Sequence, residues 1–217
     1  MEMRSAYHKK LKVIQDDVLI MGGLVGEAIQ RSVEALSNRD MELARRIIAG
    51  DREINQLRFD IEEKCIQLIA TQQPIANDLR MILAVLNIIT EAERIGDYAV
   101  GIAKISIMIG DEPPLKPLID IPRMADQTVD MLRRSLDAFI GCDAESATKI
   151  TAEDDIVDDL YNKVFQELLS FMTADPSTVT RATRLIWVAH DLERSADRVT
   201  NICERVVFVV TGKMEEI

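Results

Sequence analysis

The sequence repeats itself once, and this duplication restricts the fold more than any other feature. Segment 93–97 (Glu-Arg-Ile-Gly-Asp) aligns with segment 193–197 (Glu-Arg-Ser-Ala-Asp), 100 residues later. A proline precedes each segment, at Pro74 and Pro176. A second set of matches, at an offset of 103, pairs Asp51, Ile54, Asn55 and Leu57 with Asp154, Val157, Asp158 and Leu160. Matches in the same order on two segments indicate two copies of one module.

Helix start and stop signals along the chain predict helices on both sides of a linker. Apolar spacing, N-cap aspartates and terminal glycines predict six long helices, over about 5–36, 40–70, 75–109, 123–139, 143–172 and 175–212. Prolines crowd residues 111–122, and aromatic residues are only 4% of the chain. We therefore expect an all-α fold of two tandem pseudo-symmetric three-helix bundles, residues 1–110 and 123–217, joined by the linker 111–122.

The charge is strongly acidic and unevenly distributed. The net charge is −11, with 16 acids and 14 bases in residues 1–110 but 21 acids and 12 bases in residues 111–217. Nucleic-acid phosphates and anionic lipids repel such a chain, so we expect neither as a direct partner. The acidity of the second half has two interpretations, a solvated surface or a set of carboxylates that binds cations.

The cysteines and the hydropathy pattern indicate a soluble cytoplasmic protein. Cys65, Cys142 and Cys203 are odd in number and widely spaced, so we expect reduced, buried thiols. No apolar segment follows the first residues as in a secretory signal. The apolar run 206–210 is far too short to cross a bilayer.

The repeated acids fall on a face that otherwise packs. In the third predicted helix an apolar or small residue recurs alternately every four and three positions, at Ile82, Leu86, Ile89, Gly96, Val100 and Ala103. Glu93 belongs to that stripe, and Asp97 lies one turn further along. Glu193 and Asp197 repeat the pattern in the sixth helix. Carboxylates near a low-dielectric interior need compensation by a cation.

Two kinds of cation could compensate these acids. Arg94, Arg194 and Arg198 are adjacent in sequence and could form ion pairs. Alternatively, Asp51 with Asn55, and Asp154 with Asp158, could add oxygen ligands from a neighbouring helix and complete a metal site. Oxygen ligands favour Mg, Mn, Ca or Fe.

Several functional motifs are missing. His8 and His190 are the only histidines, too few for the paired Glu-x-x-His motifs of a ferritin-like di-iron bundle. Segment 21–23 (Met-Gly-Gly) lacks the Lys-Ser/Thr of a phosphate-binding loop and instead suits close helix approach or a kink. Trp187 fits a core position. Nothing in the sequence indicates an enzyme.

The motifs together resemble the PhoU family of phosphate-transport regulators. The resemblance rests on both Glu-Arg-x-x-Asp segments, on segment 21–23, on 73–80 (Gln-Pro-Ile-Ala-Asn-Asp-Leu-Arg) and on 201–204 (Asn-Ile-Cys-Glu). It extends from about residue 5 to 212 and implies two three-helix bundles with metal clusters on the acidic motifs. The ligands it implies are Asp51, Asn55, Glu93, Asp97, Asp154, Asp158, Glu193 and Asp197.

The two implied metal sites differ. Asn55 offers an uncharged oxygen where the family pattern has an acid, so we expect the first site to bind metal more weakly. Segment 195–196 (Ser-Ala) replaces the usual Ile-Gly and changes the room at the second site.

The resemblance also implies a regulatory role in phosphate homeostasis. Such a protein is an adaptor between the ATPase of the phosphate ABC transporter and a sensor histidine kinase, is commonly a homodimer, and negatively regulates uptake when phosphate is ample. Two other functions stay open from the residues themselves, a carboxylate-bridged metalloenzyme and a structural helical scaffold without metal.

Overall fold

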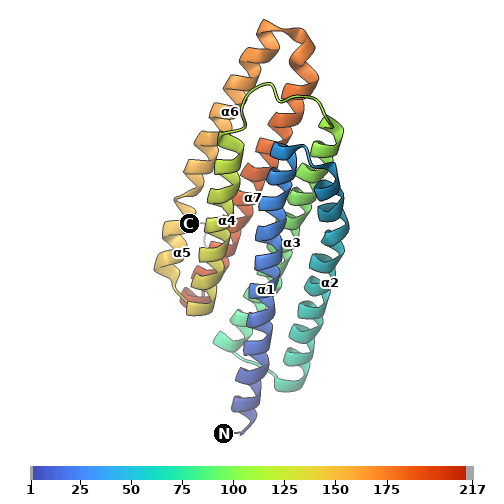
Figure 1. The fold of residues 1–217 in the computed structure, drawn as a ribbon. Coiled ribbons are helices and arrows are strands. Elements are labelled where there is room, and N and C mark those ends of the chain that lie inside the picture. The colour runs from blue at the N-terminus through green and yellow to red at the C-terminus, as the bar shows by residue number, and fades with distance from the viewer. Residues whose placement is uncertain (1, 214–217) are drawn as a thin grey trace.

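Stretches with helical apolar spacing become long helices in the computed structural model, which describes residues 2–213 (Figure 1). In chain order they are α1 (Glu2–Asn38), α2 (Met41–Gln72), α3 (Asn77–Ile109), α4 (Asp120–Gly141), α5 (Ala144–Thr151), α6 (Asp154–Ala174), a 3-10 turn (Pro176–Thr178) and α7 (Val179–Thr211). The described part of the chain contains no strand. The predicted all-α fold is confirmed.

The helices form two three-helix units, α1 with α2 and α3, and α4 with α5–α6 and α7 (Figure 1). The central interface joins α3 to α7, and α1 also packs on α4. The main apolar core runs through both units, from Tyr7 in α1 to Val209 in α7. The acidic motifs of α3 and α7 are therefore held on the two helices that contribute most to this core.

The fifth predicted helix is interrupted. Expected as one helix over 143–172, it divides into α5 and α6 at Ala152 and Glu153. Here the amide of Glu153 donates to the carbonyl of Ile150 over 3.0 Å, and the amide of Ile156 donates to that of Glu153 over 3.1 Å. These contacts span three residues instead of four, so the chain turns more tightly than an α-helix.

Helix ends follow capping chemistry. The side chain of Asp143 accepts a hydrogen bond from the Ser146 amide, and that of Asp175 accepts one from the Ser177 amide. α4 begins at Asp120, before the predicted start near residue 123. Pro122 lies in its first turn, where a missing amide proton removes no helical hydrogen bond.

Two predicted core residues are exposed. Trp187 has 50% of its surface exposed, because the buried face of α7 at this level belongs to Val188 and Ala189, rotated away from it around the helix. Cys142 is also exposed. It ends α4 in a left-handed conformation with φ of 50°, which turns the chain outward.

Gly22 confirms the close helix approach predicted for segment 21–23. A Cβ atom at Gly22 would lie 2.0 Å from Cδ1 of Leu136 in α4. Within residues 2–213 no helix is both long and apolar enough to cross a membrane.

Candidate functional site

Four acids of the second half meet where α6 packs against α7. Asp154 and Asp158 are one turn apart on α6, and Glu193 and Asp197 are one turn apart on α7. All four side chains are intermediate in exposure, so none is fully solvated and none is fully buried. The duplicated spacing has thus placed two carboxylate pairs face to face.

Burial, followed by crowding of like charge, shifts the pKa values of this group. The pKa of Asp154 is raised to about 7, first by burial and then by the charges of Asp158, Asp197 and Glu193. Burial also raises the pKa of Asp158, with Asp197 as the next cause. The pKa of Glu193 is raised by burial and then by Asp197. The folded chain therefore resists full ionisation of Asp154, Asp158 and Glu193.

Two basic side chains border this group without neutralising it. Nη1 of Arg194 donates to Oδ2 of Asp197 over 2.9 Å, which confirms one predicted ion pair. Nδ1 of His190 lies 3.3 Å from Oε2 of Glu193, at the rim, and the imidazole ring is close to Tyr161. No described residue donates a hydrogen bond to Oε2 of Glu193 or to the buried Oδ1 of Asp154.

The first-half acids form a looser group between α2 and α3. Nδ2 of Asn55 donates to Oδ2 of Asp51 over 2.7 Å. Burial raises the pKa of Asp51, and the charge of Asp97 raises it further. Asp97 is exposed, and Glu93 makes no hydrogen bond or ion pair with another described side chain. The structure thus associates Asp51 with Asn55 and Asp97, and Glu93 lies one turn before Asp97 on α3.

The carboxylate oxygens of these acids suit a cation that prefers oxygen ligands. Oδ1 of Asp51, Oδ1 of Asp154 and Oε2 of Glu193 are buried carboxylate oxygens without a hydrogen-bond partner in the described chain. Such atoms are costly to desolvate unless a partner compensates them. As the side chains stand, no three acidic, histidine or cysteine residues between 2 and 213 converge closely enough to enclose an ion. Metal binding would require carboxylate rotamers to change.

The sequence prediction missed a polar contact between the halves. Arg198, expected beside Asp197, instead places Nη1 3.3 Å from Oε2 of Glu91 in α3. Nδ2 of Asn201 also lies 3.3 Å from this oxygen. Asp191 is the counterpart of Glu91 at the repeat offset of 100, and burial raises its pKa to about 6. The repeat offset of 100 could have identified Glu91 and Asp191 as a second pair of equivalent acids.

The chain contains a three-helix bundle that occurs twice. In each half, two helices that face each other carry residues of the acidic motif one turn apart. These features define a class of helical proteins with internal symmetry. The family model of the PhoU domain matches residues 18–106 and again residues 121–206. The chain belongs to the PhoU family.

Relatives match along nearly the whole chain. A phosphate-specific transport system accessory protein PhoU homolog of Aquifex aeolicus is 39% identical over 206 residues, 95% of this chain and 93% of the relative. The Escherichia coli accessory protein PhoU is 33% identical over 207 residues, 95% and 86% of the two chains.

Solved structures agree with this fold. The crystal structure of PhoU from Pseudomonas aeruginosa superposes with a TM-score of 0.90 at 33% identity, covering 95% of this chain and all of that one. The phosphate transport system regulatory protein PhoU from Streptococcus pneumoniae gives a TM-score of 0.91 at 29% identity, covering 97% and 100%.

Proposed function

We propose that this chain regulates phosphate transport and phosphate-starvation signalling as a metal-binding helical adaptor. The observation that supports this most strongly is the end-to-end match to relatives named phosphate-specific transport system accessory proteins, through both repeats. The adaptor would join the ATPase of the phosphate ABC transporter to a sensor histidine kinase and would lower uptake when phosphate is ample. It would bind its partners without catalysing a reaction.

The cation would be held by the duplicated acids. Asp154, Asp158, Glu193 and Asp197 supply the stronger site, because burial and crowding raise the pKa of Asp154, Asp158 and Glu193, and Oδ1 of Asp154 and Oε2 of Glu193 accept no hydrogen bond from a described residue. Asp51, Asn55, Glu93 and Asp97 supply the weaker one. A bound Fe, Mn, Mg or Ca ion supplies positive charge that links α6 to α7, or α2 to α3. Nothing in this role requires turnover.

The proposed setting is the cytoplasm. Cys65, Cys142 and Cys203 are all free thiols, as is typical of a reducing compartment. We propose a homodimer on the strength of the family resemblance, and light scattering of the purified protein tests it.

Two experiments separate the adaptor from its alternatives. The first asks whether the chain captures the transporter ATPase and the kinase of its own organism, and whether its deletion raises phosphate uptake. Asp154→Asn/Asp158→Asn should alter that regulation, whereas the exposed pair Asp111→Asn/Asp126→Asn should not. Capture of neither partner, with uptake unchanged by deletion, would refute the adaptor.

The second experiment addresses the metalloenzyme and the scaffold. A hydrolytic or redox turnover that depends on bound metal and disappears in Glu193→Ala would establish the metalloenzyme. If the protein contains no metal and its melting temperature is unchanged in EDTA, the structural scaffold without metal is the interpretation that remains.

A further inference from the structure

The two halves can be compared position by position around the loop that joins the first helix of each half to the next. Residues 21–51 and 124–154 align at a constant offset of 103 without a gap. Asp40 and Asp143 cap the following helices in the same way, each by accepting from the amide three residues on. Their own amides donate to Ala35 and Ala138, each over 2.9 Å. The two loops and their caps are therefore equivalent, although α2 continues as one helix through Gly50 where the second half turns at Ala152 and Glu153.

In the second half, an arginine holds a carboxylate of its own chain. Nη1 of Arg134 in α4 donates to Oε1 of Glu153 over 2.8 Å, and Nη2 donates to its other oxygen. Nε2 of Gln127 adds a hydrogen bond of 3.0 Å to Oε2 of Glu153. Nε of Arg134 meanwhile donates to Asp130 over 2.7 Å. The result is a forked carboxylate contact between α4 and the turn before α6.

In the first half, the same arginine is present but the carboxylate is missing. Arg31 corresponds to Arg134 and Glu27 to Asp130, and Nη1 of Arg31 donates to Glu27 over 3.0 Å. Gly50 stands where the second half has Glu153. Arg31 has no second carboxylate partner among the described residues.

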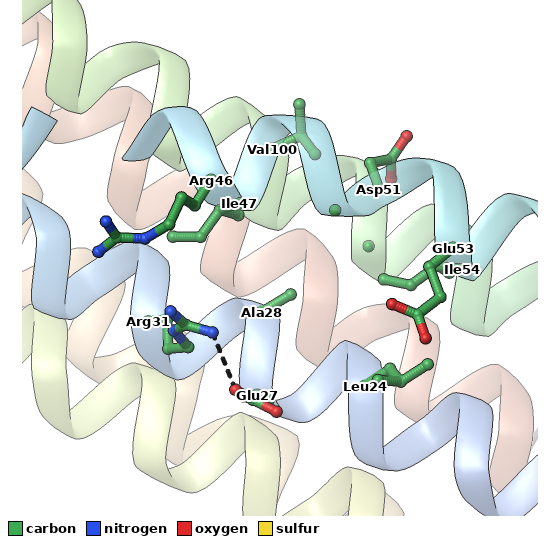
Figure 2. Close-up of a pocket in the computed structure, with 12 residues that line it drawn as sticks. Leu24, Glu27, Ala28, Arg31, Arg46, Ile47, Asp51, Glu53, Ile54 and Val100 are labelled. Atoms are coloured by element: carbon green, nitrogen blue, oxygen red, sulfur yellow. Dashed lines mark hydrogen bonds and ion pairs between the residues drawn. The ribbon is translucent and has the colours of Figure 1, made fainter. Parts of the chain in front are cut away.

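A cavity of about 240 Å³ opens beside Gly50. It is lined by residues of α1 and α2 and by Gly96 and Val100 of α3, and Figure 2 shows several of the lining side chains. Arg31 and Arg46 lie together at one end of this cavity, and Asp51 and Glu53 lie toward the other (Figure 2). Arg46, the counterpart of Lys149, forms no ion pair with a described residue.

Nothing local explains the glycine at this position. Gly50 is inside α2, has no positive φ, and a Cβ atom there would find no other atom within 4 Å. A glycine in the middle of a helix is nevertheless destabilising relative to alanine. Its observable effect here is to leave the cavity open in front of Arg31.

We propose that this cavity is a carboxylate-binding site, which takes an acidic group from outside the chain in the place that Glu153 fills in the second half. The planar carboxylate fits the guanidinium fork of Arg31, and Arg46 supplies further charge. Glu27, Asp51 and Glu53 line the same cavity and would repel a phosphate, whose charges lie on one group, more strongly than one carboxylate group of a longer molecule, whose other charges can stay outside the cavity.

The site goes beyond the adaptor role and does not need a metal. Arg31, Arg46 and Gly50 are not among the candidate metal ligands, and Asp51 lies at the opposite end of the cavity from the arginines. The acidic group could belong to a side chain of a partner protein or to a free small carboxylate. Both sources present the same chemistry to Arg31.

The test is a titration of EDTA-treated full-length protein, followed by NMR of the arginine Nε–H signals. The probes are glutarate, a glutamate-rich hexapeptide, inorganic phosphate and sodium chloride at matched ionic strength. We expect saturable binding of glutarate or the peptide that shifts the signals of Arg31 and Arg46. Tighter binding of the peptide would indicate a protein partner, and binding of glutarate alone a small molecule.

Two substitutions give each half the residue that the other half has at this position. Gly50→Glu should supply the missing carboxylate internally and weaken binding at least tenfold, whereas Ala49→Glu adds the same charge at an exposed position outside the cavity and should leave binding unchanged. Glu153→Gly should create a second site and raise the stoichiometry from one to two. A melting curve verifies that each variant is folded.

Three results would overturn the inference. They are no binding of either carboxylate probe beyond the sodium chloride effect, equal losses in Gly50→Glu and Ala49→Glu, or tighter binding of phosphate than of glutarate.

Discussion

Arg198 of α7 lies 3.3 Å from Glu91 of α3, although 107 residues separate them in the chain. Both side chains are about one-fifth exposed, 21% and 19%. The contact joins the two repeats at their central interface, and Arg198 directly follows Asp197, the second acid of the α7 pair. The helices that carry the candidate metal ligands are thus tied to each other as well as to the core.

Removal of this arginine should destabilise the protein. Arg198→Ala leaves Glu91 with only Asn201, so we expect the free energy of unfolding to fall by about 1–2 kcal/mol. Urea denaturation measures the change. Arg133→Ala, which removes an arginine that is 64% exposed, should cost less than about 0.5 kcal/mol. Equal effects of the two substitutions would mean that the Glu91 contact has no special role.

Adjacent glycines of α1 should respond differently to alanine. Both substitutions gain helix propensity, but only a Cβ at Gly22 meets Leu136, whereas Gly23 has open space around it. We expect Gly22→Ala to be less stable than Gly23→Ala by about 1–3 kcal/mol, the usual range for overpacking. Thermal denaturation of the two variants measures this difference, and equal stabilities would contradict the close packing of α1 on α4.

The second-half acids should make stability fall as pH rises. The pKa of Asp154 is raised from 3.8 to about 7, so its protonated form is favoured in the folded state. Its contribution is complete below about pH 4 and is lost as pH rises through 7. Asp158 and Glu193 shift in the same direction.

Asp154→Asn should remove much of this dependence. In EDTA-treated protein we expect the variant to melt at a higher temperature than the wild type at pH 8 and at a similar temperature at pH 4. Asp126→Asn, at an exposed position, is the control. The raised pKa would be contradicted if the melting temperatures of the wild type and of Asp154→Asn rose by the same amount between pH 5 and pH 8.

A carboxylate at position 55 should strengthen the first site. Asn55 now donates to Asp51, so Asn55→Asp replaces that hydrogen bond with a second negative charge one turn away. We expect the metal-free variant to be less stable and its first-half affinity for Mn²⁺ to rise about tenfold, because affinity increases with ligand charge. Calorimetric titration measures the affinity. Unchanged affinity would exclude residue 55 as a ligand.

Local patterns predicted much of the fold. The stripe of α3 is buried at Ile82, Ile89 and Val100, as its spacing requires, and Asp143 caps a helix as expected. These features depend on neighbours within one or two turns. The repeat similarly placed Asp154 and Asp158 opposite Glu193 and Asp197.

Contacts between distant helices were not predictable in the same way. Spacing along α7 gives Arg198 neighbours on its own helix, yet its partner is Glu91, on another helix in the other half. Trp187 was assigned to the core from its residue type, although its place around α7 faces outward. The division between α5 and α6 depends on hydrogen bonds of one tight turn that no composition rule identifies.

The most direct test of the central claim is the metal content of protein purified without chelator, measured by elemental analysis. We expect bound Fe, Mn, Mg or Ca in the wild type and a clear decrease in Asp154→Asn/Asp158→Asn, but not in Asp111→Asn/Asp126→Asn. A wild type that contains no metal, and whose content does not rise after incubation with these cations, would contradict it.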